Sequence, residues 1–141
     1  MSDLAASLRF WCDGLGFRVA YSRPEAGFAF LERDGAQVML GTINGNWQTG
    51  TLDNPLGRGI NVQIRVAAIA PLLTALEALS WPLFRDPHEV AYRVGDGQVR
   101  LRQFLVQDPD GYLLRFAEFL EAEGVSPGGP ASSPSDRRIP V

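Results

Sequence analysis

The fold is decided by residues 103–116, which read QFLVQDPDGYLLRF. Phe104 to Val106 is apolar and β-prone, and a second strand pattern resumes at Tyr112. Between them, Asp-Pro-Asp-Gly is turn chemistry, because proline presets φ at about −65° and glycine accepts a positive φ without steric cost. The stretch therefore predicts a β-hairpin.

Further helices and strands are predicted along the chain. Apolar residues at helical spacing predict one helix from about Asp3 to Leu15 and another that begins near Pro71, a residue suited to the first helical turn. Residues 43–57 are rich in Asn, Gly and Thr and are interpreted as a long loop. Strands are predicted at residues 17–21, 28–32, 38–42 and 60–66, at a short segment near 83–84 that Pro87 ends, and in a closing hairpin at about 99–119.

Composition indicates one globular domain. We place this domain at residues 1–120 of the 141-residue chain and interpret residues 121–141, with their repeated Pro, Gly and Ser, as a disordered tail. The net charge of −3 gives no electrostatic reason to expect nucleic acid, and no apolar run is long enough to span a membrane. The single cysteine, Cys12, favours a reducing compartment, so we expect a cytoplasmic protein.

A short internal repeat indicates that the hairpin is part of a larger pattern in the chain. The segment FLERDG at residues 30–35 echoes FLVQDPDG at residues 104–111. Near the N-terminus, SLRFW at residues 7–11 leads to LGF at residues 15–17. Because of these segments, residues 3–120 resemble the vicinal-oxygen-chelate superfamily, which includes glyoxalases, extradiol dioxygenases and bleomycin-resistance proteins. Within that superfamily, the chain most resembles the bleomycin-resistance-like proteins.

The resemblance implies an α+β fold. Two βαβββ modules would form cupped mixed sheets with helices on the outside. Members of the superfamily open with a strand, whereas the helical pattern here begins at Asp3. We therefore expect either that the N-terminus lies upstream or that the first module lacks its edge strand. The resemblance also implies a homodimer.

The resemblance further implies where a metal would bind, and the residues at those positions argue against one. In the superfamily's metalloenzymes, a glutamate four residues after the turn glycine binds the metal, and here that position is Arg115. The other readable positions fall on Asn61 and on Met39 or Leu40. Imidazole and carboxylate ligands are missing from this set, so we expect no metal and no other cofactor. His88, beside a proline, is expected at the surface.

The remaining hypothesis is a ligand-binding surface without catalytic residues. Strand alternation places Asn61 and Gln63 on one face, and the resemblance directs them with Arg115 toward the ligand cup. An ordinary solvated face is the alternative, as are an ion pair of Arg115 with Glu118 or Glu32 and a core position for Phe104. The candidate ligand-binding residues are Trp47, Asn61, Gln63, Tyr92, Arg102, Phe104 and Arg115.

The function expected from this reading is metal-independent binding of a small planar or cationic molecule, as in sequestration of bleomycin-type antibiotics. Two alternatives stay open. One is a metal-dependent lyase or dioxygenase of the vicinal-oxygen-chelate type, and the other is a module that senses a metabolite. Because one fold hosts many functions, the resemblance does not choose among them.

Overall fold

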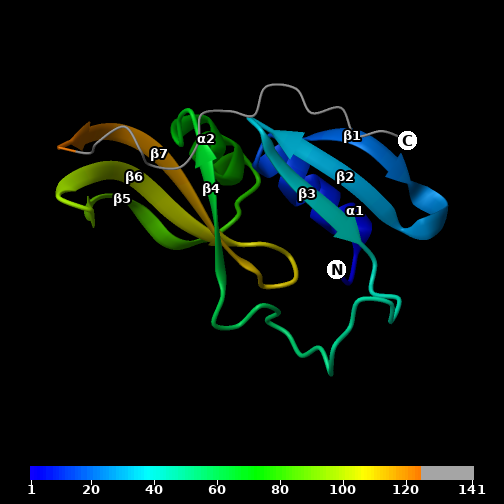
Figure 1. Ribbon diagram of the computed structural model, residues 1–141. Coiled ribbons are helices and arrows are strands. Elements are labelled where there is room, and N and C mark those ends of the chain that lie inside the picture. The colour runs from blue at the N-terminus through cyan, green and yellow to red at the C-terminus, as the bar shows by residue number, and fades with distance from the viewer. Residues whose placement is uncertain (125–141) are drawn as a thin grey trace, which may run out of the picture.

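The computed structural model describes residues 1–124 and contains two β-sheets with short helices (Figure 1). The first sheet has the strand order β1-β2-β3, and the second has the order β4-β7-β6-β5. This α+β arrangement confirms the predicted fold class. The elements are α1 (Leu4–Leu8), η1 (Arg9–Gly14), β1 (Arg18–Arg23), η2 (Pro24–Ala26), β2 (Phe28–Arg33), β3 (Ala36–Gly41), β4 (Asn61–Val66), α2 (Ala70–Ala78), β5 (Leu83–Val94), β6 (Gly97–Gln107) and β7 (Leu113–Glu123).

The first helix begins where the sequence places it. The Asp3 side chain accepts a hydrogen bond from the Ala6 amide at 3.0 Å and so satisfies one of the free amides of the first turn. After Leu8 the helix widens into a π-helical turn, η1, whose Phe10 and Trp11 are buried. This helical segment covers the core face of the first sheet.

The second sheet mixes parallel and antiparallel pairing. β4 runs parallel to β7, with Asn61 opposite Leu113 and Gln63 opposite Arg115. A parallel neighbour needs a crossover, and α2 supplies part of it. The helix starts beside Ile69, whose amide donates to the Glu118 carboxylate at 3.0 Å.

The prediction for β5 is wrong. Instead of a short strand ended by Pro87, β5 runs over twelve residues from Leu83 to Val94. It is the outer strand of its sheet, and its register against β6 shifts between Arg85 and His88. A proline lacks an amide hydrogen, but on an edge strand or at a bulge the backbone amide does not have to donate to a neighbouring strand, so Pro87 does not end β5.

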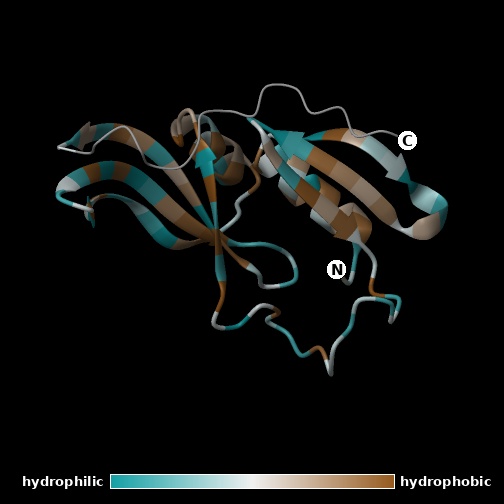
Figure 2. Ribbon diagram, in the orientation of Figure 1, coloured by the Kyte–Doolittle hydropathy of each residue, from teal (hydrophilic) through white to brown (hydrophobic). Residues whose placement is uncertain are grey.

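One hydrophobic core joins the two sheets and the helices. Phe10 and Trp11 pack in it with Ile64, Leu76 and Phe116, and each of these side chains is buried. Figure 2 shows hydrophobic stretches where the strands approach the helices, and more hydrophilic residues toward the far end of the β5–β6 hairpin. The core therefore fixes one face of each sheet and leaves the other face free.

Two strand edges face the gap between the sheets. β3 and β4 are each the last strand of their sheet, and within residues 1–124 no strand precedes α1. Met1 alone pairs beside β3: its ammonium group donates to the Gly41 carbonyl at 2.9 Å, and its carbonyl accepts from the Ile43 amide at 3.0 Å. At the other end of the chain, β7 continues to Glu123, and residues 125–141, most of the predicted tail, lie outside the described residues.

Candidate functional site

A polar network lies on the free face of the second sheet. Arg115 Nη1 donates to the Tyr92 hydroxyl oxygen at 3.2 Å, and Gln103 Nε2 reaches the same oxygen at 3.3 Å. Gln103 Nε2 also lies 3.0 Å from His88 Nε2. The four side chains come from β5, β6 and β7, and the parallel register places Gln63 of β4 directly beside Arg115.

The second candidate site is a cavity of about 740 Å³ between the edges of β3 and β4. It reaches from the free face of the first sheet, at Tyr21 and Phe28, to Val62 on β4 and the β6–β7 turn. Trp47, from the loop between the sheets, also lines it. Ligand pockets in proteins commonly measure about 300–1,000 Å³ and are lined by apolar and aromatic side chains.

Two carboxylates from the β6–β7 turn line this cavity. Asp108 Oδ1 accepts the amides of Asp110 at 3.0 Å and Tyr112 at 2.9 Å, which fixes the turn. Burial raises the pKa of the Asp108 carboxyl, and the backbone hydrogen bonds oppose this shift. Asp110 is 2% exposed; its Oδ1 accepts the amide and hydroxyl of Ser2 at 2.9 and 2.6 Å, but its Oδ2 has no partner within residues 1–124.

Aromatic rings cover the opposite wall of the cavity. The ring of Tyr21 lies 5.0 Å from that of Phe30 at an interplanar angle of 8°, and 6.0 Å from that of Phe28. The Arg23 guanidinium carbon lies 4.2 Å above the Phe28 ring centre. Tyr21 can hold a flat molecule on this wall, which also carries the positive charge of Arg23, while the turn on the other side supplies negative charge.

The structure separates the predicted ligand-binding residues into groups. Tyr92 and Arg115 meet in the polar network, with Gln63 beside them, and Asn61 is exposed two residues earlier on β4. Trp47 lies apart from them, on the cavity, and is 92% exposed.

Two of the candidates do not lie on the free face. Phe104 is completely buried in the core, with its ring 5.5 Å from that of Phe116. Arg102 lies two residues earlier on β6, so it shares that side of the strand, and it donates to Glu89 at 2.9 Å. Since alternate residues of a strand point to opposite faces, neither belongs with Arg115.

The ion pairs suggested for Arg115 are not found within residues 1–124. Glu32 pairs with Arg18 instead, and Glu118 accepts the Ile69 amide. The contact of Arg115 is the neutral hydroxyl of Tyr92, and its Nε is buried without a partner among these residues. The free face therefore holds a guanidinium whose charge no carboxylate neutralises in this part of the chain.

The positions of the expected metal site do not fit a divalent cation. Met39 is 70% exposed, Leu40 is buried, and Arg115 holds a positive charge of its own. A thioether, an aliphatic side chain and a guanidinium do not replace the imidazole and carboxylate ligands that such metals require. Across residues 1–124, no three His, Cys, Asp or Glu side chains come together in a way that could hold a metal ion.

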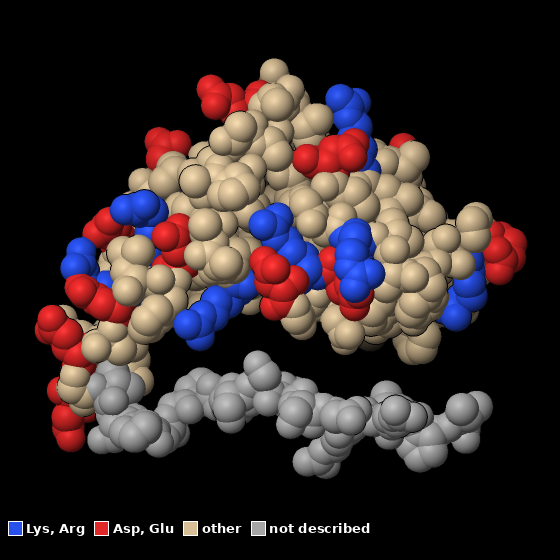
Figure 3. Space-filling model, turned by 90° about the horizontal axis from the view of Figure 1, so that it is seen from above, with Lys and Arg blue, Asp and Glu red and all other residues tan. Residues whose placement is uncertain are grey.

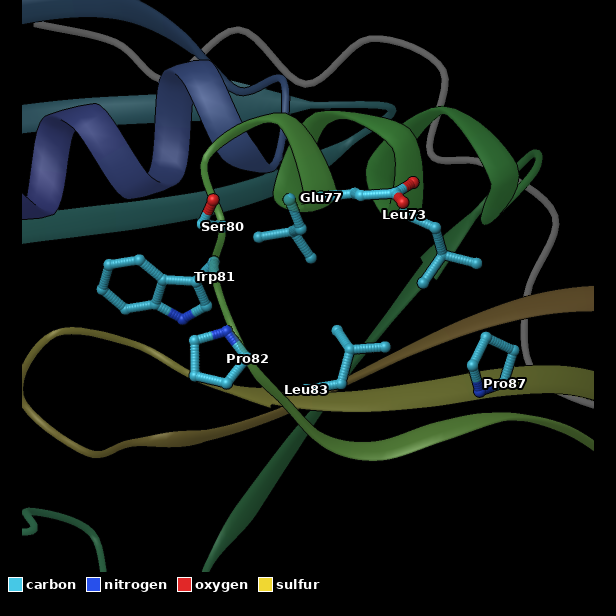
Figure 4. A pocket seen from close by; sticks show the side chains of 8 residues that line it. Leu73, Glu77, Ser80, Trp81, Pro82, Leu83 and Pro87 are labelled. Atoms are coloured by element: carbon cyan, nitrogen blue, oxygen red, sulfur yellow. The ribbon is translucent and has the colours of Figure 1, made fainter.

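Another hollow, of about 530 Å³, lies between the end of α2 and the start of β5. Figure 4 shows Leu73 and Glu77 on the helix facing Trp81, Pro82 and Leu83. It has a single charged side chain, Glu77, and the larger cavity offers more aromatic surface. We therefore treat the cavity between the sheets as the stronger binding site.

The charges seen from above are mixed. Figure 3 shows acidic and basic side chains interspersed on this face, without a broad field of one sign. One group combines Glu89 and Glu121 with Arg100 and Arg102. None of the helices described is long and apolar enough to cross a membrane.

The sequence matches the model of a known protein family over most of its length. The model of the Glyoxalase/Bleomycin resistance protein/Dioxygenase superfamily matches residues 1–116. The chain belongs to this superfamily. A comparison with curated proteins gave no match.

Solved structures of other proteins are similar to the chain. A glyoxalase/bleomycin resistance protein/dioxygenase superfamily member from Vibrio splendidus 12B01 is 35% identical, with 84% of this chain and 91% of that chain covered and a TM-score of 0.41. TioX from Micromonospora sp. ML1 is 20% identical, with 85% and 93% covered and a TM-score of 0.64. A glyoxalase-related enzyme from Fulvimarina pelagi is 24% identical, with 84% and 81% covered and a TM-score of 0.58. The last two likenesses show the fold alone.

Sequence reasoning missed several residues of both sites. The sequence pattern assigns Asp108 and Asp110 to a turn only, although a turn can also present its side chains to a ligand. Tyr21 and Phe28 lie in recognisable strands, but nothing in the sequence shows that they border a cavity with Asp110. Gln103 could have been found from alternation, because it lies two positions from Leu105, which faces Arg115 in the β6–β7 ladder.

Proposed function

We propose that this superfamily member binds a small, planar, positively charged molecule in the cavity between its sheets, without a metal and without turnover. The observation that carries the proposal is the unpartnered Oδ2 of buried Asp110 in a cavity walled by aromatic rings. A buried carboxylate oxygen without a donor is costly, and a cationic ligand would supply that donor.

The shape and chemistry of the cavity support a flat ligand. Its volume of about 740 Å³ suits a drug-sized molecule. Stacking on an aromatic ring contributes about 0.5–1.5 kcal/mol beyond the burial of area. Trp47, now largely exposed, could close over such a ligand from the loop. Sequestration of a bleomycin-type antibiotic is the form of this function that we propose.

Enzymatic activity of the glyoxalase or dioxygenase type is the competing outcome. The test compares a bleomycin-type glycopeptide, an α-keto hemithioacetal and a catechol, each added to protein dialysed against EDTA. We expect the glycopeptide to quench tryptophan fluorescence and to raise the melting temperature, because a ligand that binds the native state must stabilise it. Stabilisation by the hemithioacetal or catechol alone, with turnover after metal is added, would overturn the proposal.

A variant of the loop tryptophan makes this test specific. Trp47→Ala should weaken glycopeptide binding several-fold, as expected for the loss of one stacking contact. The variant should melt at the same temperature as the natural chain without ligand, because Trp47 is 92% exposed. Unchanged affinity for the glycopeptide in Trp47→Ala would show that the part of the cavity lined by Trp47 does not contact the ligand.

A further inference from the structure

The polar network on the free face of the second sheet carries an inference independent of the proposed function. It is built from His88, Tyr92, Gln103 and Arg115, and it lies on the face of β7 opposite to the core residue Phe116. Its hydrogen bonds leave the Tyr92 hydroxyl hydrogen and N–H groups of Arg115 without a partner inside the network.

The direction of each hydrogen bond follows from the histidine. His88 Nδ1 lies 2.8 Å from the Asp86 carbonyl oxygen, which can only accept, so Nδ1 is the nitrogen that donates; in the tautomer with one ring proton, that proton is on Nδ1. His88 Nε2 is then an acceptor for Gln103 Nε2 at 3.0 Å. The second hydrogen of the Gln103 amide points to the Tyr92 oxygen at 3.3 Å.

Tyr92 therefore receives two donors at one oxygen. Gln103 Nε2 and Arg115 Nη1 both donate to it, so its own hydroxyl hydrogen is directed elsewhere. Arg115 has further N–H groups, and within residues 1–124 its guanidinium has no carboxylate partner. A phenolic O–H and a guanidinium N–H are thus left side by side for an outside acceptor.

The buried member of the network indicates that this arrangement is built rather than accidental. Gln103 is only 3% exposed, and its Oε1 finds no donor in the described part of the chain. Leaving a buried amide oxygen unpaired costs free energy. That cost is tolerated here while the amide nitrogen holds Tyr92 in position against Arg115.

We propose that Tyr92 and Arg115 bind the carboxylate group of a small organic molecule at this face. One carboxylate oxygen accepts the Tyr92 hydroxyl and the other accepts an Arg115 N–H, which suits the planar, two-oxygen geometry of a carboxylate. Gln103 and His88 act as positioning residues.

The test uses benzoate as the probe and benzamide as its uncharged counterpart. The Nε–H signal of Arg115 in an ¹H–¹⁵N spectrum, assigned by its loss in Arg115→Gln, reports binding directly. We expect benzoate to shift this signal saturably and benzamide to leave it unchanged. Tyr92→Phe, which keeps the ring and the fold, should weaken benzoate binding about five-fold or more through the lost hydrogen bond.

A neighbouring arginine serves as the control. Arg93 follows Tyr92 on β5 and therefore points to the opposite face, so Arg93→Gln should keep benzoate affinity within about two-fold. Benzamide binding as tightly as benzoate, or equal benzoate affinity in Tyr92→Phe and the natural chain, would overturn the site. Tighter binding of inorganic phosphate than of benzoate would contradict the carboxylate assignment.

Discussion

Phe104 and Arg115 lie on adjacent strands of one sheet, yet their surroundings give them opposite roles. Phe104 is stacked against Phe116 inside the core. Arg115 is on the free face and contacts the Tyr92 hydroxyl. At the scale of the residue, the direction of a side chain on its strand decides whether it packs in the core and stabilises the fold or is available to bind a ligand.

Replacing Phe104 should therefore damage the fold. Phe104→Ala removes a fully buried ring and should lower the free energy of unfolding by about 3–5 kcal/mol. Phe119→Ala is the matched control, since Phe119 is 40% exposed and should cost less than about 1.5 kcal/mol. Urea denaturation of both variants measures the difference. Equal losses in the two variants would place Phe104 outside the core.

Asp108 should make stability depend on pH. Burial raises its pKa in the folded state, so the protonated acid is favoured there, and its stabilising contribution is lost as pH rises through that raised pKa. Asp108→Asn keeps an oxygen for the two amides but cannot ionise. Its stability relative to the natural chain should therefore increase from pH 3 to pH 7, as followed by thermal denaturation.

The control for this prediction is Asp108→Ala. Alanine removes the oxygen that accepts the amides of Asp110 and Tyr112, so this variant should be less stable than Asp108→Asn at every pH. A stability difference between Asp108→Asn and the natural chain that falls with rising pH would show that the charged carboxylate is favoured in the folded protein.

At the scale of the element, the β6–β7 turn does more than reverse the chain. Its Asp110 carbonyl accepts the Leu56 amide at 2.8 Å, and its side chain binds Ser2. The turn thereby holds both the interconnecting loop and the N-terminal segment against the second sheet. Pro55 lies so close to the fourth residue of the turn, Gly111, that a larger residue than glycine would clash with it there.

Gly111→Ala should accordingly loosen this contact. Gly111 has φ of +95°, and an added Cβ would lie 2.7 Å from Pro55 Cα. Gly45→Ala is the control, because Gly45 has φ of +85° and its Cβ would meet nothing within 4 Å. The control isolates the cost of a positive φ, about 1 kcal/mol, and Gly111→Ala should exceed it in denaturant unfolding. Equal costs would show that the loop does not pack on the turn.

Local patterns predicted most elements but not their extent. The alternation of Ile64 and Val66 with polar residues gave β4, and the Asp-Pro-Asp-Gly turn gave the closing hairpin. The failure at Pro87 came from applying the rule for a central strand to an edge strand. Strand order is set by long-range pairing, so a local window cannot reveal which rule applies.

At the scale of the whole molecule, the cavity exists because two sheets meet at unpaired edges. Asp110, Tyr21 and Trp47 are far apart in sequence and converge only when both modules are in place. Periodicity identifies faces of single strands, but it contains no information about the distance between two sheets. The polar network was partly predictable, since Arg115 and Tyr92 were both candidates, whereas the cavity was not.

The exposed edges also lead us to expect a homodimer. Free edge strands with apolar side chains favour pairing with a second chain, and Met39 on β3 is 70% exposed. Analytical ultracentrifugation should find twice the chain mass of 15.4 kDa. Met39→Lys should shift the equilibrium toward the monomer, because lysine disfavours edge pairing. A monomer at all accessible concentrations would contradict this expectation.

At the scale of the whole molecule, we also predict that the protein holds no metal. Since Met39, Asn61 and Arg115 offer no suitable ligand set, the purified chain should contain less than a tenth of a divalent metal ion per molecule, an order-of-magnitude bound. Elemental analysis checks this, and titration with Zn²⁺ should leave the melting temperature unchanged. About one Zn, Ni, Fe or Mn per chain would restore the enzyme hypothesis.

The central claim, that the cavity between the sheets binds a planar cation through Asp110, is tested most directly by calorimetric titration with the planar cationic dye proflavine. Asp110→Asn preserves an oxygen for Ser2 and removes only the charge. The natural chain should bind one dye, and Asp110→Asn should bind it about ten-fold more weakly, as expected for a lost charge-assisted hydrogen bond. Equal affinity in the two proteins, or no binding to the natural chain, would contradict the account.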